Sequence, residues 1–245
     1  MLNIVIPIAG RGSRFVEEGY ELPKPLILVH NIPMIQVVCN NLKPICDHRF
    51  IFLCLKEHID KYQINNRLRE LEPTCEIVVV ESVTAGAACT VLLAEEHINN
   101  DDSLMIANGD QLVDIDINDY LSASRDLSYD GFIMTMWADH PKWSYLRLNE
   151  NNKITEVVEK QVISNEATVG IYNYTHGHYF VKAAMKMIQK DLRVNNEFYV
   201  APAYNELIQD GYNIGYYNVG IEYDDMHGLG TPIDLKHYLN HKGIK

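Results

Sequence analysis

The stretch that decides the fold is Asn3-Ile4-Val5-Ile6-Pro7-Ile8, which runs directly into Ala9-Gly10-Arg11-Gly12-Ser13-Arg14-Phe15. Its mostly apolar first part predicts a strand that is buried on both faces. The connection over residues 9–23 is then roughly fifteen residues long, whereas an ordinary loop between strand and helix has about 2 to 6. A loop of this length after a first strand indicates a binding function.

The composition of this loop suits phosphate. It holds Ala9, Gly10, Arg11, Gly12, Ser13 and Arg14 in order, and the Lys24-Pro25 pair follows soon after. The glycines let the backbone turn tightly and present N–H groups, and the arginines offer bidentate contacts to phosphate. The loop is neither a Walker A motif nor G-x-G-x-x-G, because no G-K-[ST] follows and Phe15 stands at the last position. Phosphate binding is favoured over a mobile surface turn.

Short apolar runs alternate with helical patterns through the first half of the chain. Strands are predicted at 3–8, 50–55, 76–80 and 103–107, and helices at 34–42, 58–71 and 86–97. Pro33, just inside a cap at Asn31, should begin the first of these helices. Such alternation is typical of βαβ units, and right-handed crossovers close them into an α/β three-layer sandwich, Rossmann-like, with a mostly parallel central sheet.

The second half changes character, with shorter strands separated by polar turns. Strands are predicted at 132–137, 145–149, 154–158, 169–174 and 214–219, and helices at 179–190, 201–209 and 233–241. There is no internal repeat, low-complexity tract or linker. We therefore predict a single domain over residues 1–245, whose second half forms a substrate lobe.

Composition limits the classes of partner. Hydrophobic residues make up 47% and charged residues 22% of the 245 residues, the balance of a soluble globular protein. The net charge of −12 disfavours nucleic acid and anionic membranes as partners, although local cations still permit small phosphorylated substrates. The five cysteines form no C-x-x-C pair and are read as reduced core residues. No signal peptide or membrane-length apolar run is evident, which predicts a cytoplasmic protein.

An acidic residue follows the predicted strand at 103–107, in the sequence Asn108-Gly109-Asp110-Gln111. The carboxyl edge of the sheet is the usual ligand position in open α/β folds. A carboxylate there can hold Mg²⁺ against triphosphate oxygens, and Mg²⁺ uses one or two protein carboxylates. Asp110 is therefore the predicted metal ligand, with an ordinary turn aspartate as the alternative.

Taken in order, several segments resemble the sugar-phosphate nucleotidyltransferases of the GT-A-like fold. They are Gly10-Arg11-Gly12-Ser13-Arg14-Phe15, Lys24-Pro25, Gly109-Asp110, Glu159-Lys160, Val169-Gly170-Ile171-Tyr172 and Gly230-Thr231-Pro232. The resemblance spans nearly the whole chain. It implies a Mg²⁺-dependent reaction in which a phosphate monoester attacks the α-phosphorus of a nucleoside triphosphate and releases pyrophosphate.

The resemblance implies roles for residues on the nucleotide side, within 1–125. Arg14 matches the arginine that contacts the triphosphate, and Lys24 matches the lysine that steadies the α-phosphate region. Asp110 matches the first Mg²⁺ ligand. The backbone over residues 9–13, together with Asn108, completes the expected nucleotide site.

The acceptor side is expected within 126–245. Lys160 of the Glu159-Lys160 pair matches the lysine that meets the acceptor's phosphate. Gly170 and Tyr172 belong to the strand that lines the acceptor pocket in the family. An ordinary exposed ion pair is the alternative for Glu159 and Lys160.

Base selection in the family occurs near a glycine that opens a helix, here Gly86 with Ala85 before it. Relatives that use thymidine or uridine nucleotides have a glutamine five positions before this glycine, where this chain has Glu81. An ionised carboxylate only accepts hydrogen bonds, so it suits the amino group of cytosine and opposes O4 of uracil or thymine. CTP is favoured over UTP and dTTP, while purines are not excluded, and a Glu81 facing solvent is the alternative.

A departure from the family lies near the C-terminus. Many relatives have a W-x-D-x-G-T segment whose aspartate is a second metal ligand, and this chain has Gly228 at that position. Asp225 is the predicted replacement, with its neighbour Asp224 close behind. Asp234 is a weaker candidate than either, because the Gly-Thr-Pro-x-Asp segment usually opens a helix, and absence of the ligand is also open. His227 is not expected to bind Mg²⁺, which prefers oxygen.

Within the family the chain is most similar to the cytidylyltransferases of bacterial capsule assembly, which implies L-glutamine phosphate as acceptor and CDP-L-glutamine as product. Sugar 1-phosphates and phosphocholine are alternatives. Asp114-Ile115-Asp116 spells the D-x-D of a GT-A glycosyltransferase, but it leads into a helical stretch beyond the expected metal position. A nucleotide-binding regulator without activity is the remaining class. All expected substrates are small molecules, and a homo-oligomer is possible.

Overall fold

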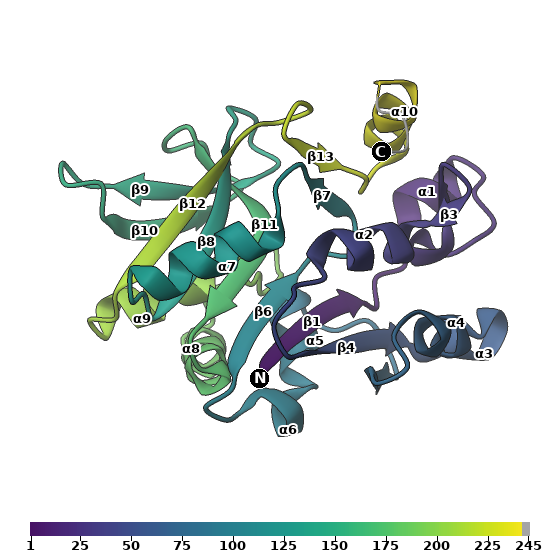
Figure 1. Ribbon diagram of the computed structural model, residues 1–245, viewed down its shortest axis with the longest axis horizontal. Helices are drawn as coiled ribbons and strands as arrows, with labels where there is room; N and C mark the ends of the chain where they lie inside the picture. The colour runs from purple at the N-terminus through teal and green to yellow at the C-terminus, as the bar shows by residue number, and fades with distance from the viewer. Residues whose placement is uncertain (242–245) are drawn as a thin grey trace.

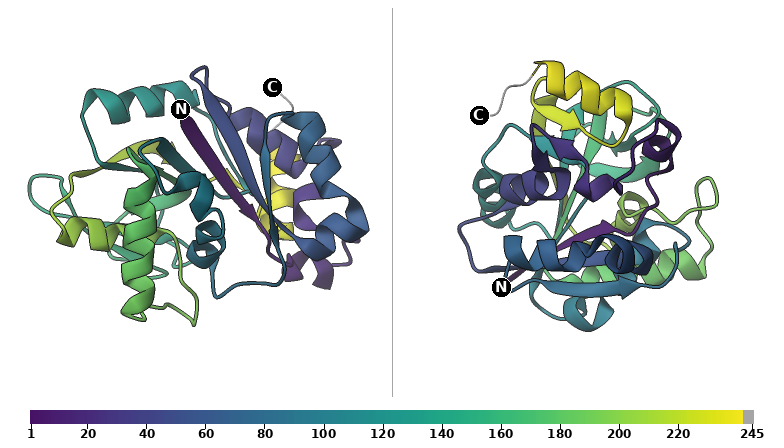
Figure 2. Two further views of the ribbon diagram at one scale, coloured as in Figure 1. Left: turned by 90° about the horizontal axis from the view of Figure 1, so that it is seen from below. Right: turned by 90° about the vertical axis from the view of Figure 1, so that its right-hand side faces the viewer.

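In the computed structural model of this protein, which describes residues 1–241, helices lie on both faces of one central sheet (Figure 1). Figure 2 shows the same layers from two further sides. Two buried hydrophobic clusters, one on each face, join the layers. The predicted three-layer α/β fold is confirmed.

The strands are β1 (Leu2–Ile8), β2 (Leu28–Val29), β3 (Ile32–Pro33), β4 (His48–Leu55), β5 (Glu76–Val80), β6 (Ser103–Ala107), β7 (Gln111–Val113), β8 (Gly131–Trp137), β9 (Ser144–Leu148), β10 (Ile154–Glu159), β11 (Glu166–Tyr174), β12 (Ile214–Ile221) and β13 (Met226–Gly228). The α-helices are α1 (Ser13–Glu17), α2 (Met34–Leu42), α3 (Lys56–Tyr62), α4 (Ile64–Leu71), α5 (Ala87–Leu92), α6 (Glu95–Ile98), α7 (Ile117–Asp126), α8 (Gly177–Gln189), α9 (Tyr204–Gln209) and α10 (Pro232–His241). Short 3₁₀ turns cover Lys24–Leu26 and Ala201–Ala203.

Strands from both halves of the chain share one nine-stranded sheet within the described residues. Strands β5, β4, β1 and β6 are neighbours and run parallel. Strand β11 pairs antiparallel with β6 and so joins the second half to the first. Strands β8, β9 and β10 continue the antiparallel part, and β12 pairs parallel with β8. The second half of the chain, where a substrate lobe was predicted, is therefore an extension of the same sheet.

Strand β1 shows why the first half folds as predicted. Its Ile4 and Ile6 face one hydrophobic cluster, and Val5 faces the other, all with no exposed surface. Successive side chains of a strand point to opposite faces, so a continuous apolar run buries both. Burying each such side chain contributes about 1.5–3 kcal/mol, which stabilises β1 at the centre of the sheet.

The helix at 34–42 has the predicted extent, but the predicted cap at Asn31 is wrong. Pro33 belongs to β3, which pairs with β2 in a small hairpin. His30 and Asn31 form its turn with φ of 47° and 67°, the left-handed conformation that a tight two-residue hairpin turn requires. Asn31 is therefore a turn residue rather than a helix cap.

Two other predicted helices are each divided. The segment 58–71 lies in α3 and α4, which meet at Gln63 in a left-handed conformation (φ 52°). The segment 86–97 lies in α5 and α6. Helical periodicity marks the buried face of both parts, but it does not reveal a break between them.

A two-stranded ribbon brings the C-terminal region to the first half. Strand β13 pairs antiparallel with β7, and beyond the ribbon the Leu229 N–H donates to the Asp110 carbonyl at 2.7 Å. Helix α10 follows directly and lies beside α1 and α2 (Figure 1). Residues after β13 are thereby placed next to the predicted metal ligand.

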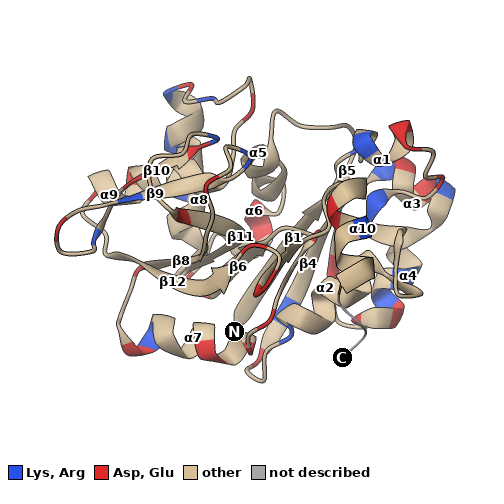
Figure 3. Cartoon of the chain, turned by 90° about the horizontal axis from the view of Figure 1, so that it is seen from above, with Lys and Arg blue, Asp and Glu red and all other residues tan. Residues whose placement is uncertain are grey.

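Acidic and basic residues are interspersed along the described part of the chain (Figure 3). Among residues 1–241, no helix combines the length and apolar character needed to cross a bilayer.

Candidate active site

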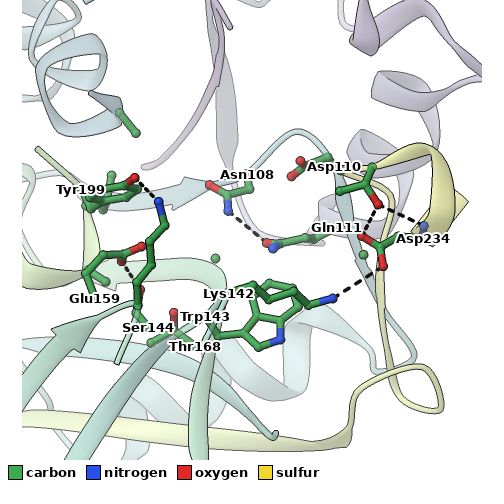
Figure 4. A pocket seen from close by; sticks show the side chains of 18 of the residues that line it. Asn108, Asp110, Gln111, Lys142, Trp143, Ser144, Glu159, Thr168, Tyr199 and Asp234 are labelled. Carbon is green, nitrogen blue, oxygen red and sulfur yellow. Dashed lines mark hydrogen bonds and ion pairs between the residues drawn. The ribbon is translucent and has the colours of Figure 1, made fainter. Parts of the chain in front are cut away.

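A cavity of about 430 Å³ lies where the carboxyl ends of the parallel strands face β9, β10 and β11 (Figure 4). A smaller cavity of about 300 Å³ adjoins it and is lined by Ala9, Gly10 and Gly86, among others. Both cavities are lined by Lys24, Ala87, Asn108 and Asp110. Because they share these residues, the two cavities are parts of one site.

The long loop after β1 contributes through one side chain and its backbone. Arg14 lines the larger cavity from α1, a short helix that the sequence did not predict. Gly12 has φ of 63°, and a Cβ there would lie 3.2 Å from the Lys24 Cβ, so this position requires glycine. Arg11 instead lines a separate cavity beside α3, and the structure does not bring it into the site.

Lys24 and Asp110 form an ion pair at the junction of the two cavities. The Lys24 Nζ lies 2.8 Å from Asp110 Oδ2, and both side chains are largely buried. They follow β1 and β6, which are neighbouring parallel strands, so their loops meet at one edge of the sheet. Gly230 makes room for this pair, because a Cβ there would lie 2.5 Å from Asp110 Oδ2.

Two side-chain amides connect the nucleotide side to β11. The Asn108 Nδ2 donates to Gln111 Oε1 at 3.2 Å, and the Asn108 backbone N–H donates to the Gly170 carbonyl. Gly170 has φ of 81°, and a Cβ there would lie 2.1 Å from Gln111 Oε1. Gly170 therefore has a structural reason to be glycine as well as its expected place in the acceptor pocket. Gln111 was not predicted as a site residue.

Lys160 and Glu159 lie at the end of β10 and both line the larger cavity. Figure 4 shows Glu159 there. The Lys160 Nζ donates to the Tyr199 hydroxyl and lies 4.4 Å from the centroid of its ring. Glu159 is only 8% exposed and accepts a hydrogen bond from Ser144, its cross-strand partner. The alternative of an ordinary exposed pair is therefore wrong.

Burial governs the protonation of the acids at this end. Burial raises the pKa of Glu159 above its usual value, although the Ser144 hydrogen bond and the Lys160 charge oppose the shift. Burial also raises the pKa of Tyr199, with a further contribution from Glu197. The Tyr172 hydroxyl lies 3.0 Å from Thr168 Oγ1 at the same wall of the cavity, and burial raises the pKa of Tyr172 too. This wall therefore presents neutral phenols and one lysine to the cavity.

The other end of the cavity holds a cation that the sequence did not reveal. Lys142 Nζ lies 2.6 Å from Glu222 Oε1 and 3.5 Å from Asp234 Oδ1. It also lies over the rings of Trp143 and Tyr223, at 4.8 and 5.3 Å from their centroids. Burial disfavours the charged form, but hydrogen bonds to Glu222 and Tyr223 outweigh it, so the pKa of Lys142 is raised. Lys142 lies in a polar turn without a motif, so no sequence signal identifies it.

Asp225 does not reach the site. Its Oδ2 accepts a hydrogen bond from the Ile221 N–H at 3.0 Å, which closes the turn between β12 and β13. Its carbonyl accepts a hydrogen bond from the Asp114 N–H at 2.8 Å, at the end of the β7–β13 ribbon away from Asp110. The metal prediction for Asp225 is therefore corrected: Asp234 is the acid from this region that lines the cavity with Asp110.

Glu81 also lies away from both cavities. Its side chain is 76% exposed and approaches the Lys56 Nζ at 3.9 Å, so the solvent-facing alternative holds. Gly86 has φ of 129°, and a Cβ there would lie 2.5 Å from the Phe198 backbone. This close approach, with the Phe198 N–H donating to the Ala85 carbonyl, brings Glu197 to the rim of the smaller cavity.

The D-x-D sequence has a different role. The Asp116 side chain accepts a hydrogen bond from the Asn118 N–H and caps α7. The Asp114 carboxylate lies 3.4 Å from His227 Nε2. The trio leads into a helix as expected.

The oxygen donors of the site fit Mg²⁺. Asp110 and Asp234 line the cavity, and Mg²⁺ is bound by one or two carboxylates together with substrate phosphates. Within residues 1–241, no cluster of three or more His, Cys, Asp or Glu side chains forms a complete metal cage. The site therefore suits an ion that arrives with a triphosphate.

Residues 4–223 match the model of a protein family described as Nucleotidyl transferase. The chain belongs to this family. A nucleoside-diphosphate-sugar pyrophosphorylase from Vibrio cholerae has the same fold, with a TM-score of 0.81, 22% identity, and coverage of 97% of this chain and 100% of that one. The inositol-1-phosphate CTP transferase from T. maritima superposes with a TM-score of 0.68 and 14% identity, over 99% of this chain and 98% of that one.

The bifunctional protein GlmU from Methanococcus aeolicus is similar in sequence, at 23% identity over the whole of this chain. The chain spans only 56% of that relative's length. The GlmU of Methanocaldococcus jannaschii is also 23% identical, over 71% of this chain and 40% of the relative.

Proposed function

We propose that this chain is a Mg²⁺-dependent nucleotidyltransferase that transfers CMP from CTP to a small phosphate monoester and releases pyrophosphate. The observation that carries the proposal is the Lys24–Asp110 pair at the junction of two cavities, with Lys160 facing the larger one. The smaller cavity takes the nucleoside and the larger one takes the acceptor. The reacting phosphates then meet beside Lys24 and Asp110.

The reaction is an in-line substitution. An oxygen of the acceptor phosphate attacks the α-phosphorus, and the bond from that phosphorus to the bridging oxygen breaks, so pyrophosphate leaves with the electron pair. Lys24 and Arg14 hold the triphosphate, and Lys160 orients the acceptor phosphate with the N–H donors that its Tyr199 bond leaves available. Positioning and charge neutralisation supply most of the rate in such reactions. Mg²⁺, when bound at Asp110, neutralises charge on the phosphates.

Cytosine is the proposed base, with Glu197 replacing Glu81 as its reader. Glu197 is the carboxylate at the rim of the smaller cavity, beside Thr84 and Gly86. A carboxylate accepts from the amino group of cytosine and repels O4 of uracil. Glu197→Gln should therefore raise the UTP/CTP rate ratio, and Glu81→Gln is the matched control that leaves it unchanged. The reverse result would restore Glu81 as the reader.

L-glutamine phosphate is the proposed acceptor, and CDP-L-glutamine the product. The charged end of the cavity supports it, because Lys142 complements a carboxylate and Glu222 beside it complements an ammonium group. Phosphocholine fits less well, because the Lys142 ammonium already lies over the Trp143 and Tyr223 rings that a trimethylammonium group would use. Sugar 1-phosphates are the competing class, because structural neighbours such as the Vibrio cholerae pyrophosphorylase bear sugar nucleotide names.

The decisive experiment measures pyrophosphate release with Mg²⁺ and each nucleoside triphosphate against L-glutamine phosphate, phosphocholine and several sugar 1-phosphates. Fast release is expected for CTP with L-glutamine phosphate. Release with a sugar 1-phosphate alone would keep the transferase proposal and reject the acceptor. No release with any pair would reject the enzyme.

A further inference from the structure

Tyr199 lies between charged groups from the two sides of the site. Its hydroxyl accepts a hydrogen bond from the Lys160 Nζ, which also lies 4.4 Å from the centroid of its ring. Burial raises the pKa of Tyr199, and a hydrogen bond to the Glu197 side chain raises it further, so the hydroxyl keeps its proton. A phenol hydroxyl both donates and accepts, so it can serve the carboxylate and the ammonium group at once.

We propose that Tyr199 is a positioning residue for the transfer reaction, which holds the Lys160 ammonium group where the phosphate of the acceptor binds. The proposal rests on the nucleotidyl-transfer function, because that function supplies the acceptor phosphate. Tyr199 acts through Lys160 rather than on the reacting atoms. Figure 4 shows Tyr199 beside Glu159, at the end of the cavity away from Asp234.

Lys160 needs a partner to hold its side chain. It directly follows β10 with φ of 55°, the left-handed conformation that residues other than glycine rarely adopt. Its N–H donates to the Trp143 carbonyl at 3.0 Å, which fixes the backbone at the wall of the cavity. The four-carbon stem beyond this point is flexible, and ordering it costs side-chain entropy. The hydroxyl and the ring of Tyr199 together restrict where the ammonium group lies.

Tyr199 is itself anchored on both sides. The Phe198 N–H donates to the Ala85 carbonyl at 2.8 Å, and the Phe198 carbonyl accepts from the Ala88 N–H at 3.0 Å. Phe198 and Val200 are buried in the same hydrophobic cluster, and Tyr199 between them lines the larger cavity. Because the backbone before and after Tyr199 is fixed, the ring can hold the lysine rather than move with it.

The segment that carries Tyr199 also reaches the nucleotide side. Glu197 lines the smaller cavity, and its hydrogen bond to Tyr199 orients the phenol from that side. One short stretch of chain thus contacts the proposed nucleoside cavity and the lysine of the acceptor cavity.

The experiment measures the binding of inorganic phosphate by phosphorus NMR, with Mg²⁺ and the non-reacting analogue α,β-methylene-CTP already bound, so that phosphate reports the acceptor position. Tyr199→Phe removes the hydroxyl and keeps the ring, so it should weaken phosphate binding by about 5–20-fold. Tyr199→Leu removes both and should weaken it further. Tyr212→Phe is the matched control, because Tyr212 has the Lys182 Nζ 5.9 Å from its ring centroid but lies away from both cavities. It should bind phosphate as the wild type does.

A double-mutant cycle with Lys160→Met separates positioning from a general structural role. If Tyr199 acts through Lys160, adding Tyr199→Phe to Lys160→Met should cause no further loss of phosphate affinity, because the hydroxyl then has no ammonium group to hold. If the hydroxyl only stabilises the fold, the two losses should multiply.

Three results would each overturn the assignment: multiplied losses in the cycle, wild-type phosphate affinity in both Tyr199 variants, or a loss in Tyr212→Phe as large as that in Tyr199→Phe. Phosphate binding is read without turnover, so this inference and the proposed function can fail separately. A chain that shows the expected cycle yet releases no pyrophosphate would refute the transfer reaction and leave the assignment of Tyr199 to Lys160 intact. Turnover together with multiplied losses would do the reverse.

Discussion

The two sides of the cavity present their chemistry in different ways. On the nucleotide side, Lys24 and Asp110 project from loops beyond the ends of β1 and β6. On the acceptor side, Glu159, Ser144 and Tyr172 belong to strands and are buried in the sheet. A loop residue can change without disturbing the ladder of hydrogen bonds, whereas a buried strand residue also contributes to stability. Substitutions on the nucleotide side should therefore change activity with little change in stability, and those on the acceptor side should change both.

The largest effect is expected for Asp110→Asn, because it removes a metal ligand and leaves Lys24 without its ion-pair partner. Pyrophosphate release should fall by about 10³-fold or more, while the midpoint of thermal unfolding changes by only a few °C, about 2–4 °C per kcal/mol. Steady-state assays and calorimetry on the same preparation check both. Retention of the wild-type rate would remove Asp110 from the metal site.

Lys160→Met tests the acceptor side through the lysine that lines the larger cavity at the end of β10. Loss of a hydrogen bond to a charged phosphate costs about 1.5–3 kcal/mol, so kcat/KM for the acceptor should fall by about 10–100-fold. The KM for CTP should stay unchanged. Lys153→Met, in the exposed turn between β9 and β10, is the matched control. An equal loss for both substrates would place Lys160 on the triphosphate instead.

Gly170→Ala tests whether the acceptor wall is a structural element. The alanine backbone would have to keep φ of 81°, and its Cβ would collide with Gln111 Oε1 and Asn108 Nδ2. The free energy of unfolding should therefore fall by about 1–3 kcal/mol. Gly211→Ala is the control, because Gly211 has φ of 86° with nothing within 4 Å of its Cβ position. Urea denaturation of both variants separates the cost of the positive backbone φ, which both share, from the cost of the steric collision, which only Gly170→Ala has. Equal losses would show that collision adds nothing at Gly170.

The smallest effect is a pH dependence from Glu159. Burial raises its pKa in the folded protein, so the folded state holds this proton more tightly than the unfolded chain does. The resulting stabilisation is complete below the usual glutamate pKa and is lost as pH rises through the raised value. Against Glu159→Gln, which stays neutral, the wild type should therefore lose relative stability as pH increases from about 4.3. The free energies of unfolding come from urea denaturation at a series of pH values. The same pH dependence in the two proteins would contradict this prediction.

The fold was predictable because its signals are local. The apolar runs of β1, β5 and β6 each contain enough residues to be recognised without their neighbours. The polar groups that end strands, Asn108 and Asp110 above all, mark the carboxyl edge of a parallel sheet. The wrong predictions also concern local features. The break between helices at Gln63 and the hairpin turn at Asn31 depend on left-handed backbone conformations, which hydrophobic periodicity does not detect.

By itself, therefore, the sequence determined the α/β class, the loop with Arg14 and Lys24, and the acid after β6. Only the tertiary structure showed which acidic residues line the site, because their local sequences do not distinguish them. Glu81 faces solvent and Asp225 closes a turn, while Glu197 and Asp234 line the cavities. These placements depend on which strand β13 pairs with and on how closely Phe198 approaches Gly86. Such contacts join residues that lie far apart in the chain, and hydrophobic patterning carries no information about them.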